Sequence, residues 1–352
     1  MTSLLWRRPP NNFNLMRLVA AWMVLFSHSY HLLGQGAQEP LMRLTGGRMT
    51  LGTFAVGVFF AISGYLITAS AYARPGLGEF LVARVRRIFP GLALVVVLSA
   101  LLLGPCYSSL AGGAYFGAAA TYTYMLRNIT LVSLQYGLPG VFAANPFGGV
   151  VNGSLWTLPI EFSLYLAVGG GVLALRLLRR AGDTLWPLLA LGAACAVAWT
   201  LLLQGKQAGT LVLVPYFLLG ALCRIARLAL RGAVAALMAL AAAGSLWLAP
   251  QLFPVLACLA ISYGTLWLAR HPRWIVPVNL DRVGDLSYGT YLFAFPIQQS
   301  LVASGWAAQP LLLCLEASVL VAPAAWLCWH LVERHFVAPA STPDAPLRGA
   351  RT

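Results

Sequence analysis

The sequence has few charged residues, and acidic ones are the scarcest. Only 9 of the 352 residues are Asp or Glu, charged residues make up 9% of the chain, and hydrophobic residues make up 60%. A water-soluble domain carries about 25% charged residues, so this composition excludes a soluble globular enzyme. Apolar runs long enough to cross a hydrocarbon layer of roughly 30 Å follow one another along the chain. The sequence therefore predicts an all-α, polytopic integral membrane protein.

Metal-binding and disulfide patterns are also missing. The six cysteines form no C-x-x-C pair and no cysteine–histidine spacing of a metal site, and most of them lie inside apolar runs. We therefore predict no metal, and we interpret the cysteines as packing residues. Basic residues, in contrast, number 23 and give a net charge of +14. They form short clusters between apolar runs, which favours membrane orientation over nucleic-acid binding.

Hydropathy predicts about ten transmembrane helices. An additional apolar stretch, 113–133, is ambiguous, because Gly112, Gly113 and Gly117 lie at or near its start and a loop rich in Gly, Pro and Asn follows it. The predicted spans are 14–33, 51–71, 88–104, 155–175, 185–203, 209–224, 231–249, 252–269, 285–304 and 309–331.

The distribution of basic residues decides how to treat the ambiguous stretch. If 113–133 is re-entrant or lies on the surface, 18 of the 23 basic residues fall on one side of the membrane. If it crosses, the cluster at 176–180 moves to the opposite side from the other basic loops. Because basic loops stay cytoplasmic, we predict that 113–133 does not span and that both termini are cytoplasmic. We expect residues 1–338 to form one membrane-embedded domain and the Pro-rich segment 339–352 to be a disordered cytoplasmic tail.

Two ionisable residues lie inside the first predicted span. Arg17 and His28 are 11 residues apart, which places them about 20° apart on one helix face and roughly 16 Å apart along the axis. Ionisable groups within a span are costly and usually face a polar cavity or a partner. Arg17 is a candidate channel residue, with a lipid-headgroup anchor as the alternative. His28 is a candidate catalytic base, with a structural hydrogen bond as the alternative.

The fourth predicted span contains one acidic residue, Glu161, within NGSLWTLPIEFSLYL. Counting from the outer surface, Glu161 and His28 lie at similar depths, which predicts that the carboxylate orients the imidazole. The alternative is that Glu161 has a packing role. Trp156 of the same segment and Ser63, in the small-residue patch of the second span, are candidate acceptor or channel residues.

Further polar residues lie near the third and ninth spans. The sequence RVRRIFP places Arg84 and Arg87 on the cytoplasmic side, where guanidinium groups pair with donor phosphates or with lipid headgroups. In DRVGDLSYGTYLFAFPIQQS, Tyr288 and Tyr291 share a face, and Gln298 lies well inside the apolar run. These three are candidate acceptor or channel residues. The alternative for the tyrosines is a place in the aromatic belt at the membrane interface, and the alternative for the amide is helix bridging.

The motifs, in this order, resemble acyltransferase family 3, the integral-membrane O-acyltransferases that modify O-antigens, exopolysaccharides and related glycans. The resemblance rests on the Arg-x10-His element, GVFFAISGYLI, RVRRIFP, SLWTLPIEFSLYL and DLSYGTYLFAFPIQQ. Many members have a histidine in the last segment where this chain has Ala294. The resemblance therefore leaves His28 as the one intramembrane imidazole base.

The resemblance implies an acyl-coenzyme A co-substrate, with acetyl as the default acyl group, and a glycan or lipid-linked sugar as acceptor. We expect a multi-pass protein of the bacterial inner membrane, in which Arg17, Arg84 and Arg87 bind the donor. His28, held by Glu161, would take the proton from the attacking sugar hydroxyl, and an acyl-histidine intermediate is the variant mechanism. Two rival functions are a transporter or flippase of a lipid-linked sugar, and a non-catalytic scaffold.

Overall fold

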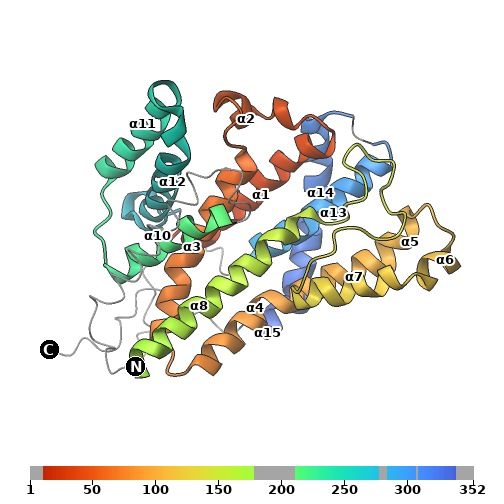
Figure 1. The fold of residues 1–352 in the computed structure, drawn as a ribbon, viewed down its shortest axis with the longest axis horizontal. Helices are drawn as coiled ribbons and strands as arrows, with labels where there is room; N and C mark the ends of the chain where they lie inside the picture. Colours follow the sequence, from red (N-terminus) through yellow and green to blue (C-terminus); the bar gives the residue numbers. More distant parts are fainter. Residues whose placement is uncertain (1–10, 178–210, 277–283, 307, 338–352) are drawn as a thin grey trace, which may run out of the picture.

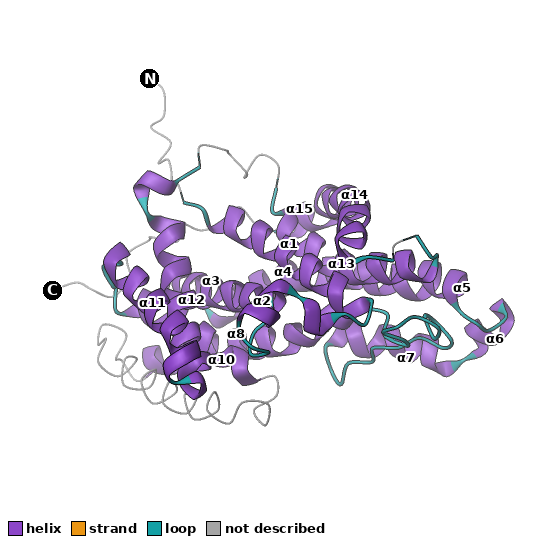
Figure 2. Ribbon diagram, turned by 90° about the horizontal axis from the view of Figure 1, so that it is seen from above, coloured by secondary structure: helices purple, strands orange, loops and turns teal. Residues whose placement is uncertain are grey.

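The computed structural model describes residues 11–177, 211–276, 284–306 and 308–337. All regular secondary structure in these ranges is helical, without a β-strand (Figure 2). The predicted span 185–203 and the predicted tail 339–352 lie outside the described residues. The remaining described helices agree with the predicted spans to within a few residues, except for the third.

Five described helices are long and apolar enough to cross a membrane, and the chain is therefore a membrane protein. They are Leu51–Ala73, Leu77–Tyr107, Gly153–Arg176, Pro250–Arg270 and Pro310–Phe336. Two shorter apolar helices are Leu211–Ile225 and Gly232–Leu248.

Helix α3 (Leu51–Ala73) is the centre of the bundle (Figure 1). Its apolar window is 78% buried, whereas that of the helix Gly153–Arg176 is 22% buried and so lies at the periphery. The helices packed around α3 are α1 (Phe13–Leu32), α8 (Leu158–Leu177), α10 (Val214–Ile225) and α12 (Phe253–Arg270), and α11 (Gly232–Leu248) packs on α12.

Two glycines allow α3 and α10 to touch through their backbones. A Cβ atom added to Gly64 would lie 1.9 Å from the carbonyl oxygen of Phe217, and one added to Gly220 would lie 2.1 Å from that of Ala61. Small residues at such crossings let helix axes approach closely in a membrane. The crossing fixes the part of α3 that carries Ser63.

The third predicted span, 88–104, is longer in the structure than expected. Helix α4 runs Leu77–Leu98 and continues through a π-helical turn, Ser99–Leu103, into α5, Gly104–Tyr107. The arginines of RVRRIFP therefore lie inside the helix and not before it. Arginine is a good helix former, and Arg87 meets carboxylates at this point, so the charge does not end the helix.

The stretch 113–133 forms two short helices, α6 (Gly112–Gly117) and α7 (Ala119–Thr130), which lie with α5 at one edge of the molecule (Figure 1). Twelve residues of α7 reach about 18 Å, less than a hydrocarbon layer. Ser108 before these helices pairs with Val141 after them. The two ends of the segment that contains α6 and α7 therefore lie side by side, at Ser108 and Val141.

The last helices complete the bundle beside α1. Helix α13 (Leu286–Ala303) packs between α1 and α14 (Pro310–Cys328), and α14 continues through a π-helical turn, Trp329–Glu333, into α15, Arg334–Phe336. This arrangement brings the start of α1, the middle of α4, the start of α13 and the end of the chain's last helices to one region.

Candidate active site

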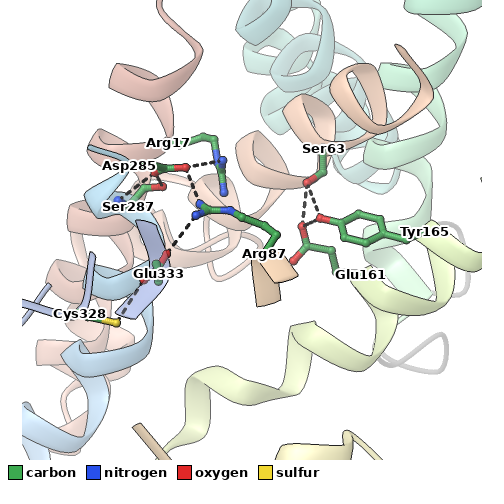
Figure 3. A network of polar contacts seen from close by, with 9 residues as sticks. All are labelled: Arg17, Ser63, Arg87, Glu161, Tyr165, Asp285, Ser287, Cys328 and Glu333. Atoms are coloured by element: carbon green, nitrogen blue, oxygen red, sulfur yellow. Dashed lines mark hydrogen bonds and ion pairs between the residues drawn. The ribbon is translucent and has the colours of Figure 1, made fainter. Parts of the chain in front are cut away.

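An ionic network connects α1, α4, α13 and the turn after α14 (Figure 3). Arg17 pairs with Asp285 at 2.9 Å, and Arg87 pairs both with Asp285 and, at 3.0 Å, with Glu333. Asp285 also caps α13, because its carboxylate accepts a hydrogen bond from the backbone N–H of Ser287 at 3.2 Å. One acidic side chain thereby fixes the start of α13 and two arginines.

The network is electrically balanced and shielded from solvent. Two guanidinium groups face two carboxylates, and the side chains of Arg87, Asp285 and Glu333 are only 14%, 14% and 1% exposed. Breaking one pair in such a place leaves a buried charge without compensation, at a cost of about 3–5 kcal/mol. The network therefore holds four chain segments together.

A cavity of about 40 Å³ lies beside the network. Since one water molecule needs roughly 10–15 Å³ by this measure, the cavity has room for a few waters. Four sequence-predicted residues meet at its wall, namely Arg17, Glu161, Tyr288 and Tyr291. The other lining residues are Val56, Phe59, Phe60, Thr157, Leu158 and Ser287.

Glu161 joins α8 to α3 at this cavity. Its Oε1 accepts a hydrogen bond of 2.8 Å from Ser63 Oγ and another from the hydroxyl of Tyr165 (Figure 3). Ser63 follows Phe59 and Phe60 by about one turn, on the same face of α3. The structure thus brings the predicted residues Ser63 and Glu161 into direct contact.

The two predicted tyrosines line the cavity while their hydroxyl groups bind backbone outside α13. Tyr288 donates to the carbonyl oxygen of Ile88 at 2.8 Å, and Tyr291 donates to that of Ser154 at 2.7 Å. The Tyr291 hydroxyl also lies 2.8 Å from Thr157 Oγ1. Both tyrosines therefore set the distance of α13 from its neighbours as well as the shape of the cavity.

His28 lies apart from this cavity wall. Its half-buried ring meets Phe295 edge-on, with 5.2 Å between ring centroids, and its Nδ1 has no hydrogen-bond partner within the described part of the chain. A Cβ added to Gly153 would lie 2.6 Å from the same Phe295 ring. His28 is therefore at the same height in the bundle as Gly153, which precedes Glu161 by eight residues. Within the described part of the chain, no hydrogen bond or ion pair joins His28 to Glu161.

The remaining predicted residues have mainly packing contacts. Gln298 donates to the carbonyl oxygen of Leu25 at 2.9 Å and to Ser29 Oγ at 2.7 Å, so its amide bridges α13 to α1. Trp156 is half-buried against the hydrophobic core. Ala294 is fully buried in an apolar cluster between α1, α13 and α14.

Sequence reasoning missed Asp285, Glu333 and Tyr165. The sequence does indicate Asp285 and Glu333. Acidic residues are so few in this chain that each one beside an apolar run is a candidate partner for a basic residue within the membrane. Within the described ranges, no three His, Cys, Asp or Glu side chains are grouped as they would be around a metal ion.

Comparison with known proteins identifies the family. The model of the family described as an acyltransferase domain matches residues 11–331, which is nearly the whole chain. This chain belongs to acyltransferase family 3. It is therefore an acyltransferase, as the motifs predict, and all residues that line the cavity lie within the matched part of the chain.

Two curated relatives of this acyltransferase cover almost its full length. It is 29% identical over 348 residues to a protein named O-acetyl transferase from Shigella phage Sf6, with 94% of this chain and 97% of the relative aligned. It is also 29% identical over 354 residues to Nodulation protein 10 from Rhizobium leguminosarum bv. viciae, with 92% of each chain aligned. No solved structure matches.

Proposed function

We propose that this acyltransferase moves an acetyl group from acetyl-coenzyme A to a hydroxyl group of a cell-surface or lipid-linked glycan. The name of the Shigella phage Sf6 relative supports both the acetyl group and an oxygen acceptor. The bacterial or phage origin of both relatives supports a place in the bacterial inner membrane. The topology that goes with this proposal has ten spans, a re-entrant 113–133 and cytoplasmic termini.

The donor enters from the cytoplasmic end in this mechanism. That end carries the start of α1 and the arginines of α4, and Arg17 lines the cavity above them. The distance from Arg17 to His28 along α1 is roughly 16 Å, which the pantetheine arm bridges in the proposal. The glycan approaches from the opposite end, where Phe295 contacts both His28 and Gly153.

His28 is the proposed general base. The observation that carries this role is the Nδ1 atom, which is buried and has no hydrogen-bond partner among the described residues. Native proteins satisfy most buried polar atoms, so such an atom calls for a functional reason. His28 takes the proton from the sugar hydroxyl as the hydroxyl oxygen attacks the thioester carbonyl. The carbon–sulfur bond then breaks, and coenzyme A leaves as the thiol with the proton that His28 returns.

Glu161 supplies the second catalytic group in the proposal. It holds Ser63 and Tyr165 at the cavity wall. In the proposal Glu161 acts at this cavity and not through a contact with His28, because His28 lies at the level of Gly153, eight residues before Glu161. The Ser63 and Tyr165 hydroxyl groups hold the carboxylate in place there.

The test is acetyl transfer by the purified full-length chain in lipid nanodiscs, with radiolabelled acetyl-coenzyme A and surface glycan from the host bacterium. We expect label on the glycan and release of coenzyme A that depends on the acceptor. Mass spectrometry of the glycan from cells with and without the protein identifies the acyl group. Glycan crossing a membrane without gaining acyl mass would instead indicate a transporter.

A further inference from the structure

The two arginines of the RVRRIFP motif have opposite environments. They lie three residues apart on α4 and so share a face of the helix. Arg87 pairs with two carboxylates, whereas Arg84 has no carboxylate within ion-pair distance among the described residues. The sequence alone gives both residues the same expected role in donor binding.

Both terminal nitrogens of the Arg87 guanidinium group bind carboxylates of the protein. One terminal nitrogen bonds Glu333 and the other bonds Asp285, and the face of the group lies 5.3 Å from the ring centroid of Tyr288. Its charge is neutralised, and its side chain is 14% exposed. A phosphate would have to displace a buried carboxylate to reach it.

The guanidinium group of Arg84 lies beside two aromatic rings. The group lies 5.8 Å from the ring centroid of Phe80 and 6.0 Å from that of Tyr165, and its buried Nε has no hydrogen-bond partner within the described ranges. Tyr165 in turn donates to Glu161, which lines the cavity. Arg84 is therefore a positive charge without an ion-pair partner among the described residues, one side chain away from the cavity wall.

We propose that Arg84, and not Arg87, binds the phosphates of the acyl donor, while Arg87 is a positioning residue that Asp285 and Glu333 hold in place. This assignment rests on the proposed use of acyl-coenzyme A. A guanidinium group with free N–H donors binds phosphate oxygens in a bidentate way, which suits Arg84. The rings of Phe80 and Tyr165 contact the group by cation–π interactions and leave its N–H donors for the ligand.

The experiment compares two donors with each variant of the full chain in nanodiscs. Acetyl-coenzyme A carries phosphates, whereas S-acetylpantetheine keeps the thioester and lacks them. For Arg84→Gln we expect the KM for acetyl-coenzyme A to rise about 10- to 100-fold, the loss of a hydrogen bond between charged groups, with kcat changed little. The KM for S-acetylpantetheine should be the same as in the wild type.

Two other substitutions serve as controls on the same helix. Arg86 is exposed, so Arg86→Gln removes the same charge without touching the site, and the KM values for both donors should stay within about twofold. Arg87→Gln should affect the two donors equally, because Arg87 acts through the position of its neighbours. If Arg84→Gln does not fold, Arg84→Lys keeps the charge and should give a smaller effect that is still confined to acetyl-coenzyme A.

An equal rise in KM for both donors in Arg84→Gln would overturn the assignment, and so would a donor-selective effect of Arg87→Gln. Both results leave acetyl transfer itself intact, so the proposed function would stand. A wild-type chain that transfers acetyl from neither donor would overturn the proposed function and this assignment together.

Discussion

Ser63 Oγ donates a hydrogen bond of 2.8 Å to Glu161 Oε1 and so joins the central helix α3 to the peripheral helix α8 at the cavity. The bond connects a helix that is fixed by its backbone contact with α10 to one that faces outward along most of its length. Glu161 is therefore positioned by a rigid element, as a catalytic carboxylate requires.

The first prediction separates the charge of Glu161 from this hydrogen bond. Glu161→Gln keeps an acceptor for Ser63 and removes the negative charge, and we expect kcat to fall about 10²- to 10⁴-fold. Ser63→Ala removes one neutral hydrogen-bond donor to the Glu161 carboxylate, and we expect kcat to fall roughly tenfold. The measurement is the turnover of radiolabelled acetyl-coenzyme A. A larger effect from Ser63→Ala than from Glu161→Gln would contradict the catalytic role of the charge.

The second prediction concerns His28. His28→Ala should lower kcat by about 10² to 10⁴ without unfolding the protein, because the half-buried ring packs edge-on against Phe295 and makes no hydrogen bond through Nδ1 to the described residues. Turnover and size-exclusion elution are measured together. His335→Ala changes an exposed imidazole and is the matched control. Normal turnover in a folded His28→Ala protein would remove the imidazole from the mechanism.

Much of the fold could be predicted because a membrane restricts what a sequence can do. Each backbone polar group in lipid must be bonded within its own helix, so apolar runs and helices coincide. The first predicted span, 14–33, and α1, Phe13–Leu32, differ by one residue at each end. The third helix was predicted eleven residues too short at its start, because hydropathy penalises its arginines, and the carboxylates that pair with Arg87 come from distant residues, 285 and 333.

The site could be predicted in part. Arg17, Glu161, Tyr288 and Tyr291 were selected as polar groups within apolar runs, and all four line one cavity. The depth of Glu161 was counted as if α8 began at the outer surface. In the structure a 3₁₀ helix, Gly153–Thr157, already packs within the bundle before α8 starts, and its Gly153 meets the Phe295 ring that also contacts His28. Residue counting cannot detect a covered helix start.

The third prediction tests the close crossing of α3 and α10. In Gly64→Ala the new methyl group would meet the backbone carbonyl of Phe217 at 1.9 Å, and backbone cannot move aside as a flexible side chain can. We expect the free energy of unfolding to fall by about 1–3 kcal/mol, with a lower unfolding temperature in nanodiscs and lower activity. Gly171→Ala, where nothing lies within 4 Å, should be neutral or stabilising. Equal behaviour of the two variants would exclude the crossing as a source of stability.

The fourth prediction concerns Asp285, which has three bonding roles at once. Asp285→Ala removes the cap of α13 and the carboxylate shared by Arg17 and Arg87. We expect the free energy of unfolding to fall by about 3–5 kcal/mol, because the two arginines then have only one carboxylate, that of Glu333, between them. Glu79→Ala, in the first turn of α4, removes an acidic group outside the network and should have a much smaller effect. Thermal unfolding followed by tryptophan fluorescence compares the two.

The fifth prediction concerns the loop at residues 142–150, which covers the neighbourhood of His28. Gln299 is fully buried, donates to the carbonyl oxygens of Phe147 and Val150 at 2.7 and 2.8 Å, and accepts a bond of 2.7 Å from Asn145. The Phe147 ring contacts Phe295 at 6.2 Å between centroids, and Phe295 meets His28. The amide of Gln299 therefore fixes the loop against the side of the protein from which we expect the glycan.

Gln299→Met keeps the shape of the side chain and leaves two loop carbonyls without partners, which costs about 1–3 kcal/mol for each buried group. We expect faster proteolysis within residues 142–150 and a higher KM for the glycan, while the KM for acetyl-coenzyme A stays unchanged because the donor binds at the other end. Gln38→Met, at an exposed position, is the control. A rise in the donor KM alone would show that the loop governs the cytoplasmic end and would reverse the predicted direction of acceptor entry.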